Sequence, residues 1–361
     1  MKLSIITINY NNAEGLRKTL ASVAAQTYLH IEHIIVDGGS TDGSVEILRA
    51  YASATACIAS GCGIKDAVST ADAAVTSQPA IGAQLREATQ PVSGTLPAHN
   101  AHHQILWISE KDKGIYNAMN KGIEIALGKR IVNDDHTSSP IAYRLSPIAS
   151  KDYIQILNSG DILAAPDVTE RMFSALKETL PFREGQGVGL FYGNMIKEFP
   201  NGKRVNDTCL GEEKSKSNSL AIKRVEWTMY DFIKGTINHD PTYIRKDIYE
   251  KYGLYDDSLK IVSDWKWFVQ SVVIGGEDVY YVPINVTIFD MTGISETNLK
   301  FREDERRAEL DKMFPKAIMS DYYNYHFPLA QYKRLKKYKV WKLVYLIERL
   351  LFKMEKWGMI K

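Results

Sequence analysis

The stretch "YIQILNSGDIL", from Tyr153 to Leu163, has the pattern of a buried strand that runs into an unusual turn. Four of its first five residues are apolar or aromatic, as expected for a strand covered on both faces of a sheet. Asn-Ser-Gly-Asp is an ordinary turn composition, but Asp161 is followed at once by two more apolar residues. A lone carboxylate thus stands between two apolar runs, where a plain turn would lead into a polar connection.

The chain before this stretch alternates strand and helix patterns. Strands are expected at residues 3–8, 31–37 and 105–110, with the quoted strand as the fourth, and helices within residues 12–26, 38–51 and 114–127. Such alternation with short links predicts a parallel sheet with right-handed crossovers. Ligands of these sheets bind beyond the carboxyl ends of the strands, and we expect Asp37, Glu110 and Asp161 at such ends.

Two segments interrupt this alternation. Residues 52–104 are rich in Ala, Ser, Thr and Gln, and residues 132–151 have a loop-like composition. Both carry few large apolar residues, so we expect flexible or partly disordered insertions. The cysteines and histidines of the first segment fit no compact zinc pattern, so no metal site is expected among them. They are Cys57, Cys62, His99, His102 and His103.

Length and composition indicate a globular, intracellular chain. Its 361 residues, 45% of them hydrophobic and 24% charged, suffice for one large domain with additions or for two domains. Three cysteines, Cys57, Cys62 and Cys209, are too few for a disulfide framework and favour a reducing compartment. The start "MKLSIITINYNN" lacks the long apolar centre of a signal peptide, and no apolar run approaches a membrane span. A cytoplasmic location is therefore expected.

The C-terminal tail is strongly basic. From residue 331 to 361, ten Lys and Arg residues stand against two Glu, a balance of +8, so the remainder carries −6 within the overall net charge of +2. Apolar residues at helical spacing form one face, and basic residues lie opposite. The apolar residues are Val340, Leu343, Val344, Leu346, Ile347, Leu350, Leu351, Met354 and Trp357, and the basic ones are Lys342, Arg349, Lys353 and Lys356. Such a helix either packs on its own domain or lies on an anionic membrane surface, whereas nucleic acid is not an expected partner.

Five motifs in order resemble the inverting family 2 glycosyltransferases with the GT-A fold, of the type that builds bacterial capsular or lipopolysaccharide chains. The matching stretches are "SIITINYNN", "QTYLHIEHIIVDGGSTDGS", "WISEKDKGIYNAMNKGI", "YIQILNSGD" and "NHDPTYIRKDIYEKYGLYDDSLKIVSDW". The resemblance implies an α/β GT-A domain over residues 1–300, with a mostly parallel central sheet flanked by helices. Residues 301–361 would then form a basic, helical extension.

The resemblance explains the lone carboxylate. Expelling a nucleoside diphosphate from a sugar develops negative charge that a divalent cation neutralises, and Mn²⁺ or Mg²⁺ takes oxygen ligands. Asp161 corresponds to the last acid of the family's DxD-type motif. Here that motif reads Asn158-Ser159-Gly160-Asp161, so the earlier acids are absent and Asn158 offers a neutral oxygen. Asn158 and Gly160 are expected at the donor, and the alternative for Asp161 is an ordinary turn acid.

The resemblance also implies a nucleotide pocket. Thr7 and Asn9 on the first strand and Asp37 at the end of the second would line it, and Asp37 could accept hydrogen bonds from the base or the ribose. Asp42 is instead expected to help cap the following helix, since Asp near a helix N-terminus is usually structural.

The residues after the third strand belong to the same pocket by resemblance. Glu110 and Asp112 would approach the nucleoside, and the following helix would face the phosphates. Asn117, Asn120 and Lys121 on that helix have an equally good explanation as a polar helix face.

The acceptor side depends on two residues of the last motif. The acceptor hydroxyl must lose a proton as it attacks C1, and Asp264 matches the family's catalytic base. The alternative is that Ser263 or Asp264 caps the helix that follows. His239 matches a position near the metal or the acceptor, and a core or turn histidine is the competing interpretation.

The predicted activity is therefore transfer of a sugar from a UDP-, GDP- or dTDP-sugar to a glycan or lipid-linked acceptor, in cell-surface polysaccharide biosynthesis. A nucleotidyltransferase is an alternative, but it would carry a Gly-rich basic loop after the first strand, where this chain reads "NYNNAEGLRK". A non-catalytic nucleotide-sugar-binding or membrane-binding homologue is a second alternative. A dinucleotide dehydrogenase is disfavoured because no G-x-G-x-x-G follows any strand.

Overall fold

The computed structural model describes residues 1–59, 103–132, 152–179, 188–207, 222–292, 298–326, 332, 336, 338 and 340–359. The chain divides into two compact units, Met1–Asn298 and Leu299–Lys361. Most of both predicted insertions lies outside the described residues, as do Cys62, His99, His102 and Cys209 and the side chain of Cys57.

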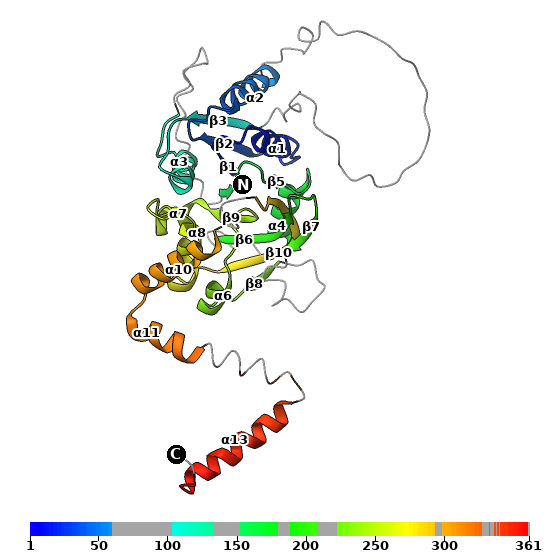
Figure 1. Cartoon of the computed structure of the whole chain (residues 1–361). Helices are drawn as coiled ribbons and strands as arrows, with labels where there is room; N and C mark the ends of the chain where they lie inside the picture. Colours follow the sequence, from blue (N-terminus) through cyan, green and yellow to red (C-terminus); the bar gives the residue numbers. More distant parts are fainter. Residues whose placement is uncertain are drawn as a thin grey trace. The chain divides into compact units, whose positions relative to one another are not determined.

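The first unit is built on one sheet, in which ten described strands take part (Figure 1). The strands are β1 (Leu3–Asn9), β2 (Ile31–Asp37), β3 (Gln104–Ser109), β4 (Tyr153–Ile156), β5 (Ile162–Leu163), β6 (Leu190–Glu198), β7 (Arg204–Asp207), β8 (Lys223–Val225), β9 (Thr242–Arg245) and β10 (Val279–Asp290). Their order across the sheet is β3-β2-β1-β4-β9-β6-β10-β5, with β7 paired to β6 and β8 paired to β10.

Helices of the first unit alternate with these strands. They are α1 (Ala13–Ala24), α2 (Ser44–Ala59), α3 (Ile115–Ala126), α4 (Val168–Thr179), α6 (Met229–Lys234), α7 (Lys246–Tyr252), α8 (Ser263–Phe268) and the π-helical continuation η1 (Val269–Ile274). Helix α2 continues through Ala59, so the first residues of the segment expected to begin at 52 are helical.

The N-terminal part of the sheet is parallel. Strands β3, β2, β1 and β4 run in the same direction, which confirms the prediction from strand–helix alternation. The register pairs Asn9 with Asp37 and Asp37 with Ser109. Three polar residues therefore meet at one edge, where the carboxyl ends of β1, β2 and β3 lie side by side.

The C-terminal part of the sheet is mixed. Strand β9 is antiparallel to both β4 and β6, whereas β10 runs parallel to β6. The short strand β5 pairs antiparallel with β10, joining Leu163 to Thr287 and Ile162 to Ile288. The stretch from Tyr153 to Leu163 therefore supplies two strands of the same sheet, and Asp161 lies in the link between them.

Helices cover both faces of the parallel strands. On one face, Leu16 and Leu20 of α1 and Leu48 of α2 form a buried cluster with Ile35 of β2. On the other face α3 approaches β1 so closely that a Cβ on Gly122 would lie 2.4 Å from Cγ2 of Ile6. Glycine at this position permits the approach, and α3 thereby brings its first turn toward the carboxyl end of β1.

The second unit is helical in its described part. Its elements are α10 (Leu299–Met313), α11 (Lys316–Asp321), the π-helical turn η2 (Tyr322–His326) and α13 (Trp341–Lys356). Helix α13 confirms the helix expected from apolar spacing in the tail, and none of its residues is buried. Among the helices of the described ranges, none combines the length and the apolar character that a bilayer crossing requires.

Candidate functional site

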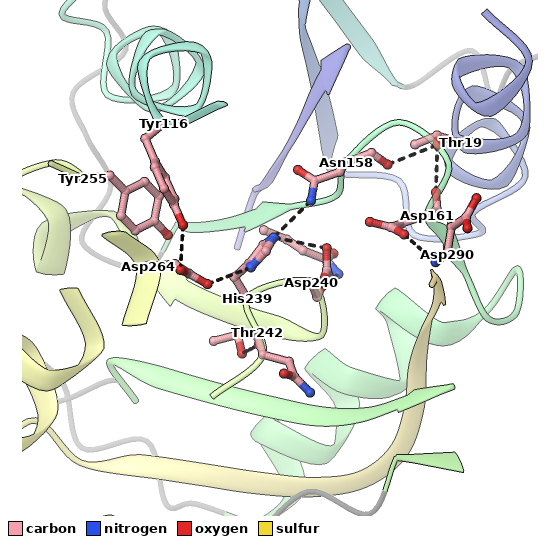
Figure 2. A network of polar contacts seen from close by, with 12 residues as sticks. Thr19, Tyr116, Asn158, Asp161, His239, Asp240, Thr242, Tyr255, Asp264 and Asp290 are labelled. Atoms are coloured by element: carbon pink, nitrogen blue, oxygen red, sulfur yellow. Dashed lines mark hydrogen bonds and ion pairs between the residues drawn. The ribbon is translucent and has the colours of Figure 1, made fainter. Parts of the chain in front are cut away.

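The turn between β4 and β5 is held by backbone contacts and by one side chain of α1. The Asp161 N–H donates to the Asn158 carbonyl at 3.1 Å, and the Ser159 N–H donates to the Ile8 carbonyl at 3.0 Å. The Thr19 hydroxyl accepts from the Gly160 N–H at 3.0 Å and donates to the Asp161 carbonyl at 2.7 Å (Figure 2). Gly160 has φ of 109°, which favours glycine.

The Asp161 side chain points into a buried acidic group. It is 3% exposed, and its Oδ1 accepts from the backbone N–H of Asp290 at 2.9 Å. Burial and the neighbouring charge of Asp240 raise the pKa of Asp161 well above its usual range. Burial likewise raises the pKa of Asp240. Buried carboxyl groups this close together require a proton or a cation to offset their charge.

The residues of this turn suit a hard divalent cation. Asp161 supplies a carboxylate, and Oδ1 of Asn158 is buried without a hydrogen-bond partner. Oxygen ligands of this kind, completed by phosphates and water, are what Mg²⁺ and Mn²⁺ take. Within the described ranges, no group of three or more His, Cys, Asp or Glu side chains is arranged to hold a metal by itself. A cation here would therefore need further oxygen ligands from water or from a bound molecule.

His239 lies between the donor-side turn and a second carboxylate. Its Nδ1 is 3.2 Å from Oδ2 of Asp264, and its Nε2 is 3.3 Å from Oδ1 of Asp240 (Figure 2). Burial disfavours the imidazolium, but the charge of Asp240 and the hydrogen bond with Asp264 outweigh it and raise the pKa of His239 to about 9. The ring is therefore a cation at neutral pH, flanked by two carboxylates.

Asn158 also contacts the ring, because its Nδ2 lies 3.2 Å from Nε2 of His239. A neutral ring with Nδ1–H toward Asp264 accepts from the amide in this orientation. An imidazolium has no acceptor left at Nε2, and this nitrogen then pairs with Oδ1 of Asp240 at 3.3 Å. The Asn158 contact is thus a hydrogen bond only to the neutral ring.

Asp264 is fixed through both carboxylate oxygens. Its Oδ1 accepts from the Tyr116 hydroxyl at 2.9 Å and its Oδ2 from His239 Nδ1 at 3.2 Å. Burial alone would raise its pKa, but the hydrogen bond and the charge of His239, with the Tyr116 hydrogen bond, hold the pKa of Asp264 below its usual value. Asp264 is therefore ionised at neutral pH, with 14% of its side chain exposed.

The capping alternative for this segment does not match the geometry. Helix α8 begins at Ser263 with Val262 as its N-cap, and no side chain forms a capping hydrogen bond there. The Ser263 hydroxyl is buried without a partner. Neither Ser263 nor Asp264 thus serves as the N-cap, and the Asp264 carboxylate is directed to Tyr116 and His239 instead.

The residues predicted to line the nucleotide pocket form a buried, hydrogen-bonded group at the ends of β1 and β2. Asp37 accepts from the Asn9 amide at 2.9 Å, the Ser40 hydroxyl at 2.6 Å and the Ser109 hydroxyl at 2.7 Å. Burial is outweighed by these hydrogen bonds, which lower its pKa. Thr7 is buried and bonds Nε2 of His33 at 2.9 Å. A nucleotide role for Thr7, Asn9 and Asp37 stays a prediction, and all three already support the sheet edge.

Asp42 has the structural role that we expected. Its Oδ2 accepts from the N–H of Ala13, the first residue of α1, at 2.8 Å. Its Oδ1 accepts from the N–H of Ser44, the first residue of α2, at 3.1 Å. One carboxylate therefore satisfies the N-terminal ends of two helices.

The residues after β3 differ in exposure and partners. Glu110 pairs with Lys121 at 2.9 Å and Arg130 at 2.6 Å, and the hydrogen bond of Lys121 is the main cause that lowers its pKa. Asp112 accepts from the Gly114 N–H at 3.0 Å, and its Oδ2 would lie 2.5 Å from a Cβ on Gly38. Asp112 therefore lies against the end of β2, whereas Glu110 is held by cations.

The polar face of α3 is occupied by the chain between α7 and α8. Asn117 donates to Asp257 at 2.8 Å, and Asn120 exchanges hydrogen bonds with the backbone of Tyr255. These contacts match the polar-face interpretation and anchor α3 beside the segment that carries Asp264.

Three residues of the network were not anticipated: Tyr116, Asp240 and Asp290. Asp240 follows His239 directly, and Asp290 ends β10, the same strand-end signal that singled out Asp37 and Asp161. Tyr116 offered no signal of its own, since an aromatic residue on an apolar helix face suggests only packing. Figure 2 shows these side chains in one continuous series of contacts from Tyr116 to Asp290.

Comparison with known proteins finds relatives among the glycosyltransferases. Residues 4–65 match the family model described as glycosyl transferase family 2. An uncharacterized glycosyltransferase of Mycobacterium tuberculosis strain H37Rv is 23% identical over 323 residues, which cover 87% of this chain and 85% of that protein. An uncharacterized glycosyltransferase of Escherichia coli strain K12 is 45% identical over 51 residues, 14% of this chain and 15% of that protein.

Solved structures resemble the chain more loosely. TarS 1–349 of S. aureus in complex with UDP has a TM-score of 0.47 at 13% identity, covering 80% of this chain and 60% of that chain. The mannosyltransferase PcManGT from Pyrobaculum calidifontis, in complex with GDP-Man and Mn²⁺, has a TM-score of 0.46 at 14% identity, covering 88% and 64%. The chain thus spans less than two thirds of both solved chains.

The relatives found by sequence support a glycosyltransferase. The family 2 model supports the type, and the residues that it matches include most of β1 and all of α1, β2 and α2. 

The free energy of unfolding should depend on the charge of His239. Because its pKa is raised to about 9 from 6.5, its contribution is fully present below about pH 6.5 and is lost as the pH rises through about 9. We expect the free energy of unfolding, measured by urea denaturation, to fall between pH 7 and 10 by up to on the order of 3 kcal/mol more in the wild type than in His239→Gln.

His30→Gln, at an exposed position, is the matched control and should keep the pH dependence of the wild type. An identical pH dependence in the wild type and in His239→Gln would contradict a buried imidazolium.

Proposed function

We propose that this chain transfers a sugar from a nucleoside-diphosphate sugar to an acceptor hydroxyl with inversion at C1. The observation that carries the proposal is the contact series that joins the Asn158–Asp161 turn to Asp264 through His239. A single displacement needs one group that stabilises the leaving diphosphate and one that takes the proton of the acceptor hydroxyl. The turn with its buried carboxylate is proposed for the first, and the ionised Asp264 carboxylate for the second.

Asp264 is the proposed base. As the acceptor oxygen attacks C1, the bond between C1 and the diphosphate oxygen breaks, and its electron pair leaves with the nucleoside diphosphate. The proton of the acceptor hydroxyl passes to Asp264, which its lowered pKa keeps ionised before the reaction. One displacement inverts the anomeric centre, so no covalent nucleophile is required.

Asp161 and Asn158 are the proposed donor-side residues, with Gly160 allowing the diphosphate to approach the backbone. A bound Mn²⁺ or Mg²⁺ would neutralise charge on the departing diphosphate. His239 contributes a positive charge between the two halves of the site, and a role as metal ligand is the less favoured proposal, since both ring nitrogens face side-chain partners.

The alternatives make different chemical predictions. A nucleotidyltransferase would release pyrophosphate from a nucleoside triphosphate and a sugar phosphate. A non-catalytic homologue would bind nucleotide-sugars without turnover. The orientation of Asp264 by two hydrogen-bond donors favours a catalytic chain over a binding protein, because binding alone needs no oriented base.

Donor binding is expected to depend on Asp161 and a divalent cation. UDP, GDP and dTDP are each added with Mn²⁺ to identify the nucleobase that the chain prefers. The matching diphosphate at 100 times its dissociation constant should stabilise the wild type by about 2.7 kcal/mol in thermal melts. Asp161→Ala should lose this stabilisation, because it removes the carboxylate of the turn. Asp167→Ala, which removes an exposed carboxylate at the start of α4, is the control. Absence of stabilisation by any diphosphate in the wild type would overturn the proposal.

Asp264→Asn should abolish turnover without weakening donor binding. Loss of a general base typically costs roughly 10²–10⁴-fold in kcat. We would measure nucleoside diphosphate release from UDP-N-acetylglucosamine, UDP-glucose and GDP-mannose, together with stabilisation by the diphosphate. Asp257→Asn, at an exposed aspartate of the same segment, should retain both properties. Wild-type turnover by a folded Asp264→Asn chain would rule out the assigned mechanism.

The acceptor is proposed to be lipid-linked, which requires an approach to a membrane surface. Helix α13 suits such an approach: its apolar face includes Leu343 and Leu350, exposed by 57% and 53%, and covers an arc of roughly 160° at 3.6 residues per turn. Lys342, Arg349, Lys353 and Lys356 line one edge of that face. A role in bacterial cell-surface polysaccharide synthesis and a cytoplasmic location are part of the same proposal.

Vesicles containing anionic phosphatidylglycerol should bind the full chain, and phosphatidylcholine vesicles should bind it less. Replacing the four edge residues of α13 by Gln should weaken anionic binding by about 1 kcal/mol for each charge removed, measured by co-sedimentation. Lys18→Gln with Lys203→Gln, at exposed positions of the first unit, is the control. Equal binding to both vesicle types, or none, would rule out this surface as an anionic-lipid contact.

A further inference from the structure

We infer that Tyr116 is the positioning residue of Asp264, fixing the carboxylate that receives the acceptor proton. The inference rests on the proposed function and adds a residue to it. The Tyr116 hydroxyl has two acceptors. They are Oδ1 of Asp264 at 2.9 Å (Figure 2) and the carbonyl oxygen of Ile261 at 2.5 Å. One hydroxyl thus contacts both the backbone that leads into α8 and the side chain that the reaction uses.

The tyrosine is itself rigidly held. Its side chain is 4% exposed and packs against Tyr255, with ring centroids 5.7 Å apart. Tyr255 is fixed in turn, because its backbone N–H and carbonyl are both bonded to Asn120 of α3. Helix α3 is seated on β1 through Gly122, so the position of the phenol is set by the sheet.

Two donors from distant parts of the chain fix the carboxylate. Tyr116 holds Oδ1 from α3, and His239 holds Oδ2 from the segment before β9. With both contacts the carboxylate plane has one orientation. Without the phenol hydroxyl, Oδ1 loses its side-chain donor, and the carboxylate can rotate about its last side-chain bond, which moves the base away from the acceptor oxygen.

Because the Ile261 carbonyl is a second acceptor, the Tyr116 hydroxyl can donate a hydrogen bond both before and after Asp264 takes up the proton. A hydroxyl has one proton to donate and an oxygen that accepts. Toward the Asp264 anion, the proton of Tyr116 is donated to Oδ1. When Asp264 has taken the acceptor's proton, the Tyr116 proton turns to the Ile261 carbonyl, and the phenol oxygen remains beside Oδ1. No proton leaves Tyr116, so it positions the base and does not replace it.

A purely structural role is the competing interpretation, since the hydroxyl also anchors Ile261. The two interpretations differ in what a variant changes. Loss of a structural anchor lowers stability and affects donor binding and turnover together. Loss of a positioning contact lowers kcat, leaves the KM of the donor unchanged, and has no effect when the base itself is already absent.

The test compares Tyr116→Phe with Tyr249→Phe, which removes a buried hydroxyl from the same aromatic group without touching Asp264. Release of nucleoside diphosphate is followed with UDP-N-acetylglucosamine, UDP-glucose and GDP-mannose, using octyl glycosides and water as acceptors. Tyr116→Phe should lower kcat roughly 10- to 100-fold at unchanged donor KM and unchanged stabilisation by nucleoside diphosphate and Mn²⁺. Tyr249→Phe should keep the wild-type kcat.

The double variant Tyr116→Phe/Asp264→Asn gives a second measurement that does not depend on the size of the single effect. It should release nucleoside diphosphate at the rate of Asp264→Asn alone, because Tyr116 acts through that carboxylate. A wild-type kcat in Tyr116→Phe, an equal loss in Tyr249→Phe, or a further loss in the double variant overturns the inference. A wild type that turns over none of the donors instead overturns the proposed function.

Discussion

The site is organised by the need to compensate negative charge away from water. Asp240 and Asp264 flank His239, Asp161 lies against Asp240, and each of the four side chains is largely buried. Isolated ions in such surroundings cost several kcal/mol each, so the imidazolium and the phenol hydroxyl are as necessary as the acids. The positions of Tyr116 and of the segment before β9 follow from this constraint, because each brings a donor or a charge to a carboxylate that lacks water.

The sheet joins the two sides of this charged group. Strands β4 and β5 flank the Asn158–Asp161 turn and belong to one sheet, whose strand β10 bonds Asp161 through the Asp290 amide. Strand β9, which follows His239 and Asp240 directly, pairs with β4. The Asn158–Asp161 turn, His239 and strand β10 are thus hydrogen-bonded neighbours. Distances between the two sides are set by ladder spacing and not by mobile connections.

Much of this was readable from the sequence, for identifiable reasons. Parallel strands alternating with helices produce repeated patterns, so the strands β1, β2, β3 and β4, their parallel direction and a place for Asp161 beyond the carboxyl end of β4 followed from periodicity and topology rules. Asp264 followed from a resemblance and not from spacing.

Asp290 and Tyr116 could not be predicted in the same way. The place of Asp290 depends on register shifts between β10 and β6, near Asn285 and Thr287, which no local pattern encodes. The role of Tyr116 depends on how closely α3 approaches β1 and on contacts to residues more than a hundred positions away. Both are products of tertiary packing.

The way the Asn158–Asp161 turn is held has a consequence for sequence variation. Its shape comes from main-chain atoms, from the Thr19 hydroxyl, from the Asn12 amide that donates to the Ser159 carbonyl at 3.0 Å, and from the freedom of Gly160. The side chains at 158 and 159 are not needed to form it. Related chains can therefore carry an acid, an amide or a hydroxyl at positions 158 and 159, and can differ in the cation that they prefer, while the backbone of the turn stays the same. Substitutions at Thr19, in a helix far upstream, would be the ones that selection removes.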